Sequence, residues 1–338
     1  MKRGNLGEWS EVYAFLRLLL LGEMPEVGSD LKISDRKIQI AKLLRDDASG
    51  VKYFITKADT YRQEGVSVSR KEIEEIVEEF PRILAAKSGV FELPKVESLL
   101  NRLGLTKIKA SSSEKIDLKA AIVSGTTGFD LELGYSIKSE IGGASTLLNA
   151  SSHTLFGYEI EESIDVSKYA AHTKVRQLIS KLVSEGVQFR HVGPKSEKLK
   201  ENLDYFGETL WKTLSQIVLL YYSGEGKEIS GLLEKVSESD SELRKNTYQV
   251  GQFLKAVALG MTPGATWEGD IEAYGGYLIV TKDGQVLALP ATNEDEFRRY
   301  LIHNSYLDTP STTRHKFGIL RKGQKATGLD LSLQIRFA

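Results

Sequence analysis

Residues 115–150 read KIDLKAAIVSGTTGFDLELGYSIKSEIGGASTLLNA, and this stretch decides the fold. Asp117 precedes an apolar run that ends at Val123, and residues 124–128 include two glycines that suit a turn. In residues 129–141 apolar and polar side chains alternate in places, with Leu131, Leu133, Tyr135, Ile137 and Ile141 on one side. A period of two is typical of a strand with one buried face. The stretch therefore predicts a β-hairpin in which Asp117 starts the first strand.

Ser136 and Lys138 lie two positions apart on the second strand, so their side chains point the same way. An aspartate that faces a small polar residue and a lysine on the next strand suits phosphodiester hydrolysis. The carboxylate can hold Mg²⁺, which keeps most of its waters and polarises a phosphoryl oxygen. The lysine orients the attacking water or stabilises charge in the transition state. A solvated strand face explains the same residues, and on these residues alone it is the favoured interpretation.

Several segments, spread over the whole chain, resemble the HpaII-type family of type II restriction endonucleases. They read KASSSEKIDLKAAI at 109–122, LGYSIKSEIGGASTLLNAS at 133–151, GNLGEWSEVYAFLRLL at 4–19, LDTPSTTRHKFGIL at 307–320 and LDLSLQIRF at 329–337. The resemblance implies an α/β fold of the α+β mixed-sheet kind. Its centre would be a restriction-endonuclease-like PD-(D/E)XK core with helical and β-hairpin additions. It also implies that Asp117 binds metal and that Lys138 is the catalytic lysine. Ser136 stands where an acidic residue is usual, so one carboxylate must come from elsewhere.

A helix expected over residues 4–21 offers two candidates for that carboxylate. Its apolar residues recur at helical spacing, as in Trp9, Val12, Phe15, Leu16 and Leu19. Glu8 and Glu11 lie about one turn apart near its N-terminus, where acidic residues are favourable in any case. PD-(D/E)XK nucleases often carry a glutamate on their first helix, so the resemblance implies that one of the two joins Asp117 in the metal site. We prefer Glu11, which lies deeper in the apolar stripe, and keep Glu8 as the alternative.

Three segments are candidates for DNA contact. Lys107, Lys109 and Lys115 precede the hairpin and could meet phosphates, although a solvated approach to a strand explains them equally well. After the hairpin, two glycines would let a phosphate backbone approach Ser145, Thr146 and Asn149, and a tight strand-to-helix connection is the alternative. Residues 310–328 contain five Lys or Arg and no Asp or Glu. Arginine suits guanine and hydroxyls suit phosphates, so this loop is either a DNA-contacting or merely a solvated basic loop. The contacts expected there are Ser311, Thr312, Thr313, Arg314, His315 and Lys316.

The remaining pattern divides the chain into three parts, which could also pack as one domain. Residues 1–162 hold the nuclease motifs, and a helix that starts at a capping box at 69–72 is expected to be interrupted at Pro81. Residues 163–262 form a mainly helical scaffold or dimer segment, and residues 263–338 form a β-rich DNA-recognition part. The helical segments are expected at 166–185, 203–222, 227–236 and 241–259. Strands are expected at 276–281, 285–289 and 329–337, with a turn at Asp283-Gly284 between the first two.

Composition excludes several classes of protein. The 338 residues include no cysteine, which excludes disulfides and Cys-ligated zinc or iron–sulfur sites. The five histidines show no ligand spacing. A net charge of −1 means that DNA binding would need a local basic patch. Apolar runs such as residues 18–21 are far too short to span a bilayer, and Glu8 and Glu11 do not suit a signal peptide. We therefore expect a cytoplasmic protein without a membrane partner.

The sequence and the resemblance together predict a type II restriction endonuclease that cuts double-stranded DNA with Mg²⁺ at a short palindromic site, with CCGG implied by the resemblance. A palindromic site would suit a homodimer. A cognate DNA methyltransferase would act on the same site, without direct binding to this chain. Two alternatives stay open. One is a repair or junction nuclease of the same fold. The other is a catalytically dead, sequence-specific DNA-binding protein. The serine at position 136, which replaces the usual acidic residue, is the feature that supports this alternative.

Overall fold

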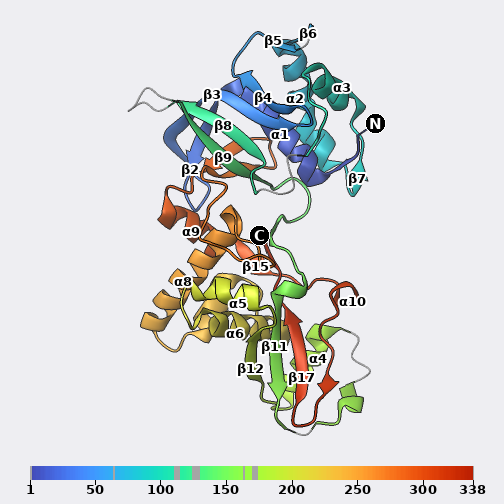
Figure 1. Cartoon of the computed structure of the whole chain (residues 1–338), viewed down its shortest axis with the longest axis vertical. Coiled ribbons are helices and arrows are strands. Elements are labelled where there is room, and N and C mark those ends of the chain that lie inside the picture. The colour runs from blue at the N-terminus through green and yellow to red at the C-terminus, as the bar shows by residue number, and fades with distance from the viewer. Residues whose placement is uncertain are drawn as a thin grey trace. The chain divides into compact units, whose positions relative to one another are not determined.

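The computed structural model describes residues 2–63, 65–109, 115–123, 130–162, 164–169 and 174–337 (Figure 1). The chain divides into two units. Unit 1 comprises Met1–Ser145 and Ile271–Phe297, and unit 2 comprises Thr146–Asp270 and Arg298–Ala338. The predicted parts 1–162, 163–262 and 263–338 follow chain order, whereas each unit draws on two separate segments.

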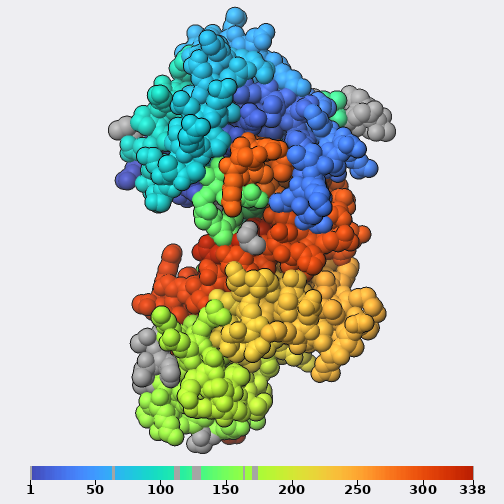
Figure 2. All heavy atoms as spheres, turned by 180° about the vertical axis from the view of Figure 1, so that it is seen from behind, coloured from blue at the N-terminus to red at the C-terminus, as the bar shows by residue number. Residues whose placement is uncertain are grey.

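Unit 1 is built on a seven-stranded mixed sheet. From one edge to the other its strands are β2 (Glu23–Val27), β14 (Val286–Leu289), β13 (Gly276–Val280), β9 (Asp130–Ser139), β8 (Leu118–Val123), β3 (Ile33–Asp47) and β4 (Gly50–Ile55). β9 runs parallel to β13, and β14 runs parallel to β2. β3 is 15 residues long and also pairs with β2, so the sheet closes on itself through this strand. Figure 2 shows the orange β13–β14 segment set between blue and cyan atoms of the N-terminal half.

The predicted hairpin is present as the antiparallel pair β8 and β9, with Ala120 opposite Leu133. Its predicted turn at 124–128 lies outside the described residues. The expectation of one buried face is wrong in part, because Ser136 is as buried as Tyr135 (3% and 1% exposed), whereas Leu131 is 54% exposed. β9 is an interior strand of the sheet, paired with β8 and β13 along its two edges, and the Ser136 hydroxyl is hydrogen-bonded by the Asp117 and Lys138 side chains.

Helix α1 (Leu6–Leu21) confirms the predicted N-terminal helix and lies at the centre of the unit 1 core. A capping box between Asn5 and Glu8 starts it, and Gly22, with φ 60°, ends it in the left-handed conformation that glycine tolerates. Trp9 and Phe15 are completely buried. Because the helix is apolar on nearly all of its faces, it is stable only where other elements surround it.

Two further helices and two short strand pairs complete unit 1. They are α2 (Arg70–Ala85), α3 (Pro94–Arg102), β1 (Gly4–Asn5) with β7 (Val90–Phe91), and β5 (Thr60–Gln63) with β6 (Val66–Ser69). The capping box between Ser69 and Glu72 is confirmed. The predicted interruption at Pro81 is wrong, since α2 runs through it. Phe80 and Leu84 on either side are both fully buried, and this packing holds the turn although proline offers no N–H.

Unit 2 combines two antiparallel sheets with most of the remaining helices. One sheet has the order β12 (Arg190–Pro194), β11 (Leu155–Ile160), β17 (Thr327–Ser332), β16 (Arg321–Lys322), and the other has the order β10 (Thr146–Leu148), β18 (Ile335–Phe337), β15 (Ser305–Leu307). The helices are η1 (Ser152–Thr154), η2 (Val166–Tyr169), α4 (Val175–Ser184), α5 (Glu197–Asp204), α6 (Leu210–Ser223), α7 (Ile229–Val236), α8 (Asp240–Leu259) and α10 (Thr312–His315). Helix α9 (Glu294–His303) crosses the boundary between the units in the sequence.

Two predictions for unit 2 need correction. The helix expected at 203–222 is divided between the end of α5 and α6, and Gly207 between them has a φ of 129°, which no helix adopts. The single strand expected at 329–337 is β17 followed by β18 in a different sheet, and the linking Leu333 N–H donates to Thr154 O instead. Among the described residues no helix is long and apolar enough to cross a membrane.

Candidate active site

Asp117, Ser136 and Lys138 form one continuous line of hydrogen bonds in unit 1. Lys138 Nζ donates to Ser136 Oγ at 3.1 Å, and Ser136 Oγ donates to Asp117 Oδ2 at 3.1 Å. The Ile137 backbone N–H donates to the same Oδ2 at 2.7 Å. The structure thus brings together the three residues that the sequence proposed.

Strand order explains why these side chains are held so firmly. The Asp117 N–H donates to Tyr135 O at 2.9 Å, so the start of β8 is attached to β9 beside Ser136. On the other side of β9, Tyr277 of β13 is in register with Ser136, and Lys138 Nζ lies 5.1 Å from the centre of the Tyr277 ring. Burial lowers the pKa of Lys138, while the negative charge of Asp117 acts in the opposite direction. The lysine therefore stands in a poorly hydrated site beside a carboxylate.

Helix α1 brings a second carboxylate to this site. Ser10 Oγ donates to Ser139 Oγ at 3.0 Å, which attaches the helix to the end of β9. Glu11, the next residue, is half-buried, and its charge acts on Lys138 together with that of Asp117. Glu8 has a different task, because its Oε2 accepts the Asn5 N–H at 2.8 Å as part of the helix cap. Of the two sequence candidates, Glu11 is the one whose charge acts on Lys138.

A buried arginine interacts electrostatically with the carboxylates of Asp117 and Glu11. Arg45 of β3 is 3% exposed, and its guanidinium lies 5.4 Å from the centre of the Phe15 ring on α1. Phe15 is one helical turn beyond Glu11 and so lies on the same side of α1. The carboxylates that act on the Arg45 charge are those of Glu11, Asp47 and Asp117. Arg45 is therefore a buried positive charge that attracts both Glu11 and Asp117.

These donors fit a magnesium ion. Both hydrogen bonds that Asp117 accepts from described residues end on Oδ2, which leaves Oδ1 for a cation. Within the described part of the chain no cluster of three or more carboxylates or histidines could hold a metal on its own. Mg²⁺ does not need such a cluster, because it is bound through one or two carboxylates and completes its shell with waters and substrate phosphate oxygens. Asp117 and Glu11 would supply the two carboxylates.

The predicted DNA-contacting residues fall in both units. In unit 1, Ser145 Oγ donates to the backbone oxygen of Ser139, the last residue of β9, at 3.1 Å. In unit 2, Thr146 belongs to β10 and Asn149 is exposed. Ser311 caps the short helix α10, which holds Thr312, Thr313, Arg314 and His315 and is followed by Lys316. Of the residues from 311 to 316, Ser311, Thr313, Arg314 and Lys316 are exposed, and Thr312 and His315 are half-buried.

The model of the HpaII restriction endonuclease family matches residues 5–337. The chain belongs to this family. It is similar to the type II restriction enzyme HpaII of Haemophilus parainfluenzae, with 32% identity over 354 aligned positions that cover 99% of this chain and 98% of that protein. No solved structure matches. Membership of the HpaII family makes the chain a nuclease of the restriction type, a class that acts on double-stranded DNA.

Sequence reasoning missed three residues of the site in this HpaII-family chain. Arg45 reads as an ordinary charge within a strand, and Tyr277 reads as one more apolar position in a buried strand. Glu272 accepts a hydrogen bond from the backbone N–H of Lys115, which lies 157 positions earlier in the sequence. Only the parallel pairing of β9 with β13 brings the region around 272–277 to the hairpin, and no local pattern in the sequence announces that pairing.

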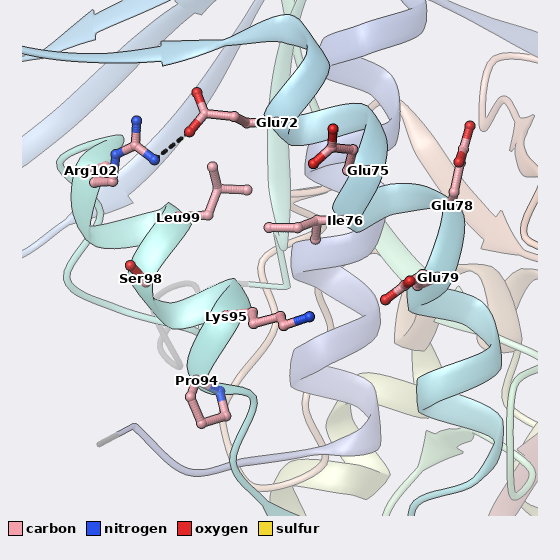
Figure 3. Close-up of a pocket in the computed structure, with 10 residues that line it drawn as sticks. All are labelled: Glu72, Glu75, Ile76, Glu78, Glu79, Pro94, Lys95, Ser98, Leu99 and Arg102. Atoms are coloured by element: carbon pink, nitrogen blue, oxygen red, sulfur yellow. Dashed lines mark hydrogen bonds and ion pairs between the residues drawn. The ribbon is translucent and has the colours of Figure 1, made fainter.

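A groove between α2 and α3 is the wrong place for DNA. Figure 3 shows four glutamates of α2 along it, with Ile76 and Leu99 between the helices. The glutamates are Glu72, Glu75, Glu78 and Glu79. Arg102 forms an ion pair with Glu72, with 2.6 Å between Nη1 and Oε1. A phosphate backbone would meet a row of like charges here, so this groove takes no part in the nuclease site.

Proposed function

We propose that the chain is a type II restriction endonuclease that hydrolyses phosphodiester bonds of duplex DNA at a short palindromic site with Mg²⁺, on a PD-(D/E)XK core. The observation that carries the proposal is the hydrogen-bonded line from Asp117 through Ser136 to Lys138, with Glu11 beside it. The overall reaction adds water to phosphorus and breaks the bond between phosphorus and the leaving sugar oxygen.

Each residue then has a distinct role. Asp117 and Glu11 hold the metal, which when bound supplies Lewis-acid chemistry that polarises a phosphoryl oxygen and makes water a better nucleophile. Lys138 orients the attacking water and stabilises the negative charge that builds up on the phosphoryl oxygens. Ser136 takes the place of the usual acid without acting as a metal ligand. Its hydroxyl accepts from Lys138 and donates to Asp117, so it fixes the distance between the lysine and the metal carboxylate.

The finer parts of the function are proposals that follow from the family and from the exposed basic loop. CCGG is the proposed target, a homodimer is the proposed assembly because a palindrome has two-fold symmetry, and a methyltransferase of the same specificity is the proposed companion in the cytoplasm. We assign DNA contacts to residues 311–316 and to Ser145, Thr146 and Asn149. Arg314 is the main candidate for base reading, since it is exposed and arginine pairs bidentately with guanine.

Digestion of a defined plasmid tests this proposal. Wild type, Asp117→Ala and Lys138→Ala are compared in Mg²⁺, and the fragment ends are sequenced. We expect discrete fragments that share one short palindrome with the wild type and none with either variant. If the well-folded wild type binds one sequence in EDTA but does not cut it across a range of Mg²⁺ and Mn²⁺ concentrations, the nuclease proposal fails. The catalytically dead DNA-binding protein then replaces it.

A further inference from the structure

Helix α4 of unit 2 has an apolar face and a polar face. Its buried side chains are Val175, Leu178, Ile179 and Leu182. On the opposite side of the helix, five polar side chains are exposed, namely Arg176, Gln177, Ser180, Lys181 and Ser184. Positions 176, 180 and 184 recur at every fourth residue and so form one line along the helix, with positions 177 and 181 beside it. The polar face is therefore continuous over the length of α4.

These polar side chains form one wall of a shallow groove, the α4 groove. Its other wall is the C-terminal end of α6, with Ser223 and Gly224. The described residues that line it include two cations and no carboxylate, whereas four glutamates line the groove between α2 and α3. Two of its hydroxyls already donate to backbone oxygens, Ser184 to Lys181 O and Ser223 to Leu220 O. The capacity of the groove to bind an anion therefore rests on Arg176 and Lys181.

Both cations are accessible to an anion. The Arg176 guanidinium lies 4.8 Å from the centre of the Tyr221 ring, and among the described residues it forms no ion pair. A guanidinium stacked on a ring keeps its N–H groups free for hydrogen bonds in its own plane. Lys181 pairs with Glu185 at 2.9 Å, but the two side chains are 49% and 40% exposed. Such an exposed pair is weak, so a phosphate can replace the carboxylate.

The α4 groove adjoins the segment with the proposed DNA contacts. The hydroxyls of Tyr221 and Thr309 are hydrogen-bonded at 2.8 Å, which attaches the start of that segment to α6. At its other end, a Cβ on Gly318 would lie 2.6 Å from Val175 Cγ2, so this glycine packs directly on α4. Residues 311–316 are thus held between two points of contact with the helices that form the groove.

We propose that the α4 groove binds the phosphate backbone of the DNA duplex, next to the base pairs that residues 311–316 contact. This inference rests on the proposed function. Arg176 and Lys181 are about 7.5 Å apart along the helix axis, and the phosphates of one strand follow one another at about 3.4 Å of duplex axis. The two cations can therefore reach different phosphates of one strand. Such contacts add affinity and fix the position of the duplex, but they do not read its sequence.

Two other roles for these cations would leave the groove without a ligand. In the first, they offset the negative end of the α6 dipole. Their replacement would then lower thermal stability and leave the salt dependence of DNA binding unchanged. In the second, Arg176 holds Tyr221 and, through Thr309, the segment at 311–316. Its replacement would then weaken binding only to the DNA sequence that the segment reads.

We would compare Arg176→Gln, Lys181→Gln, the double variant and Arg176→Lys, which keeps the charge. The control is Lys212→Gln. Lys212 is also an exposed cation over an aromatic ring, 5.6 Å from the centre of Trp211, but it lies at the N-terminal end of α6, whereas the groove is at the C-terminal end. DNA affinity is measured between 50 and 200 mM salt in EDTA. One duplex carries the site mapped by plasmid digestion, and a second duplex of the same length lacks it.

For each single Gln variant we expect the salt slope to fall by about 0.9, the value for one lost phosphate contact. The ratio of the dissociation constants at 200 and 50 mM salt then falls about 3.5-fold, and about 12-fold for the double variant. The loss should be the same for both duplexes. Arg176→Lys and Lys212→Gln should keep the wild-type slope, and thermal unfolding checks that every variant is folded.

The outcomes separate this inference from the proposed function. If the wild type cuts at one site but the folded double variant keeps the wild-type slope, the α4 groove does not bind DNA and the proposed function stands. If the loss is confined to the duplex that carries the site, the cations act through residues 311–316 and the inference is wrong. If the folded wild type neither binds nor cuts DNA, the proposed function fails and this inference fails with it.

Discussion

Ser136→Ala is the most informative single substitution in this site. The serine is 3% exposed, and its hydroxyl makes two hydrogen bonds of 3.1 Å, one from Lys138 and one to Asp117. Alanine removes both and leaves Lys138 without that acceptor in a poorly hydrated place. Asp117 is less affected, because it keeps the 2.7 Å bond from the Ile137 N–H. The main loss should therefore be the orientation of the lysine.

The magnitude follows from the kind of bond that is lost. A hydrogen bond to a charged group is worth about 1.5–3 kcal/mol. If one such bond is lost from the folded state, the free energy of unfolding falls by about 2 kcal/mol. If the same energy is lost from the transition state, cleavage slows by about 10- to 100-fold, since each 1.4 kcal/mol is a factor of ten.

Ser332→Ala is the matched control. Ser332 is 1% exposed, and among the described residues its Oγ has no hydrogen-bond partner. Removal of that hydroxyl should be neutral or slightly stabilising, because it loses no bond. Urea unfolding gives the stability of both variants, and single-turnover cleavage in saturating Mg²⁺ gives their rates. A rate for Ser136→Ala within twofold of the wild type, with no loss of stability relative to Ser332→Ala, would refute the role given to the serine.

Three further substitutions test other parts of the structure. Glu11→Gln should raise the Mg²⁺ concentration for half-maximal cleavage at least about tenfold, since it removes a proposed metal carboxylate. The control Glu8→Gln should leave that concentration unchanged. It should lower the free energy of unfolding by less than about 1 kcal/mol, because it weakens only the helix cap. Arg314→Ala should weaken DNA binding in EDTA by about 1–3 kcal/mol and relax sequence preference at one base pair, which a binding selection would detect. Arg102→Gln should flatten the acid side of the stability profile. The Arg102 ion pair and the helix cap lower the pKa of Glu72 from 4.5 to about 2, so their stabilisation is present above pH 4.5 and is lost as the pH falls towards 2. Thermal unfolding between these two pH values measures it.

Local sequence patterns predicted well the parts of the fold that local forces determine. The predicted capping box at Ser69–Glu72 starts α2 in the structure, and the helix expected over residues 4–21 from its apolar spacing is α1. The Asp283-Gly284 pair joins β13 and β14, with Gly284 at φ 83°. In each of these places neighbouring residues satisfy one another's hydrogen bonds or backbone geometry, so a short window of sequence contains the whole cause.

The errors arose where distant contacts decide the outcome. Pro81 was expected to interrupt its helix, but the buried side chains next to it keep the helix intact. Ser136 was expected on the polar side of a strand with one buried face, but it is 3% exposed and is hydrogen-bonded by the Asp117 and Lys138 side chains. The parallel pairing of β9 with β13 explains why Glu272 and Tyr277 had no signal in the sequence. A local pattern cannot reveal which strand, well over a hundred residues away, will pair with a given strand.

The serine at position 136 has a physical explanation in this arrangement. An acidic side chain there would place a carboxylate roughly where the hydroxyl now stands, 3.1 Å from Asp117 Oδ2. Two like charges at that distance repel by about 5 kcal/mol at an effective dielectric constant of 20, which disfavours an acid here in the absence of a cation. The HpaII-family chain places its second carboxylate on α1 instead, where Arg45 acts on both Glu11 and Asp117. Serine can then give Asp117 a donor and Lys138 an acceptor, which no ionised carboxylate can do at once. In the proposed site the second acid is therefore on the helix, and the strand position joins the lysine to the carboxylate of Asp117.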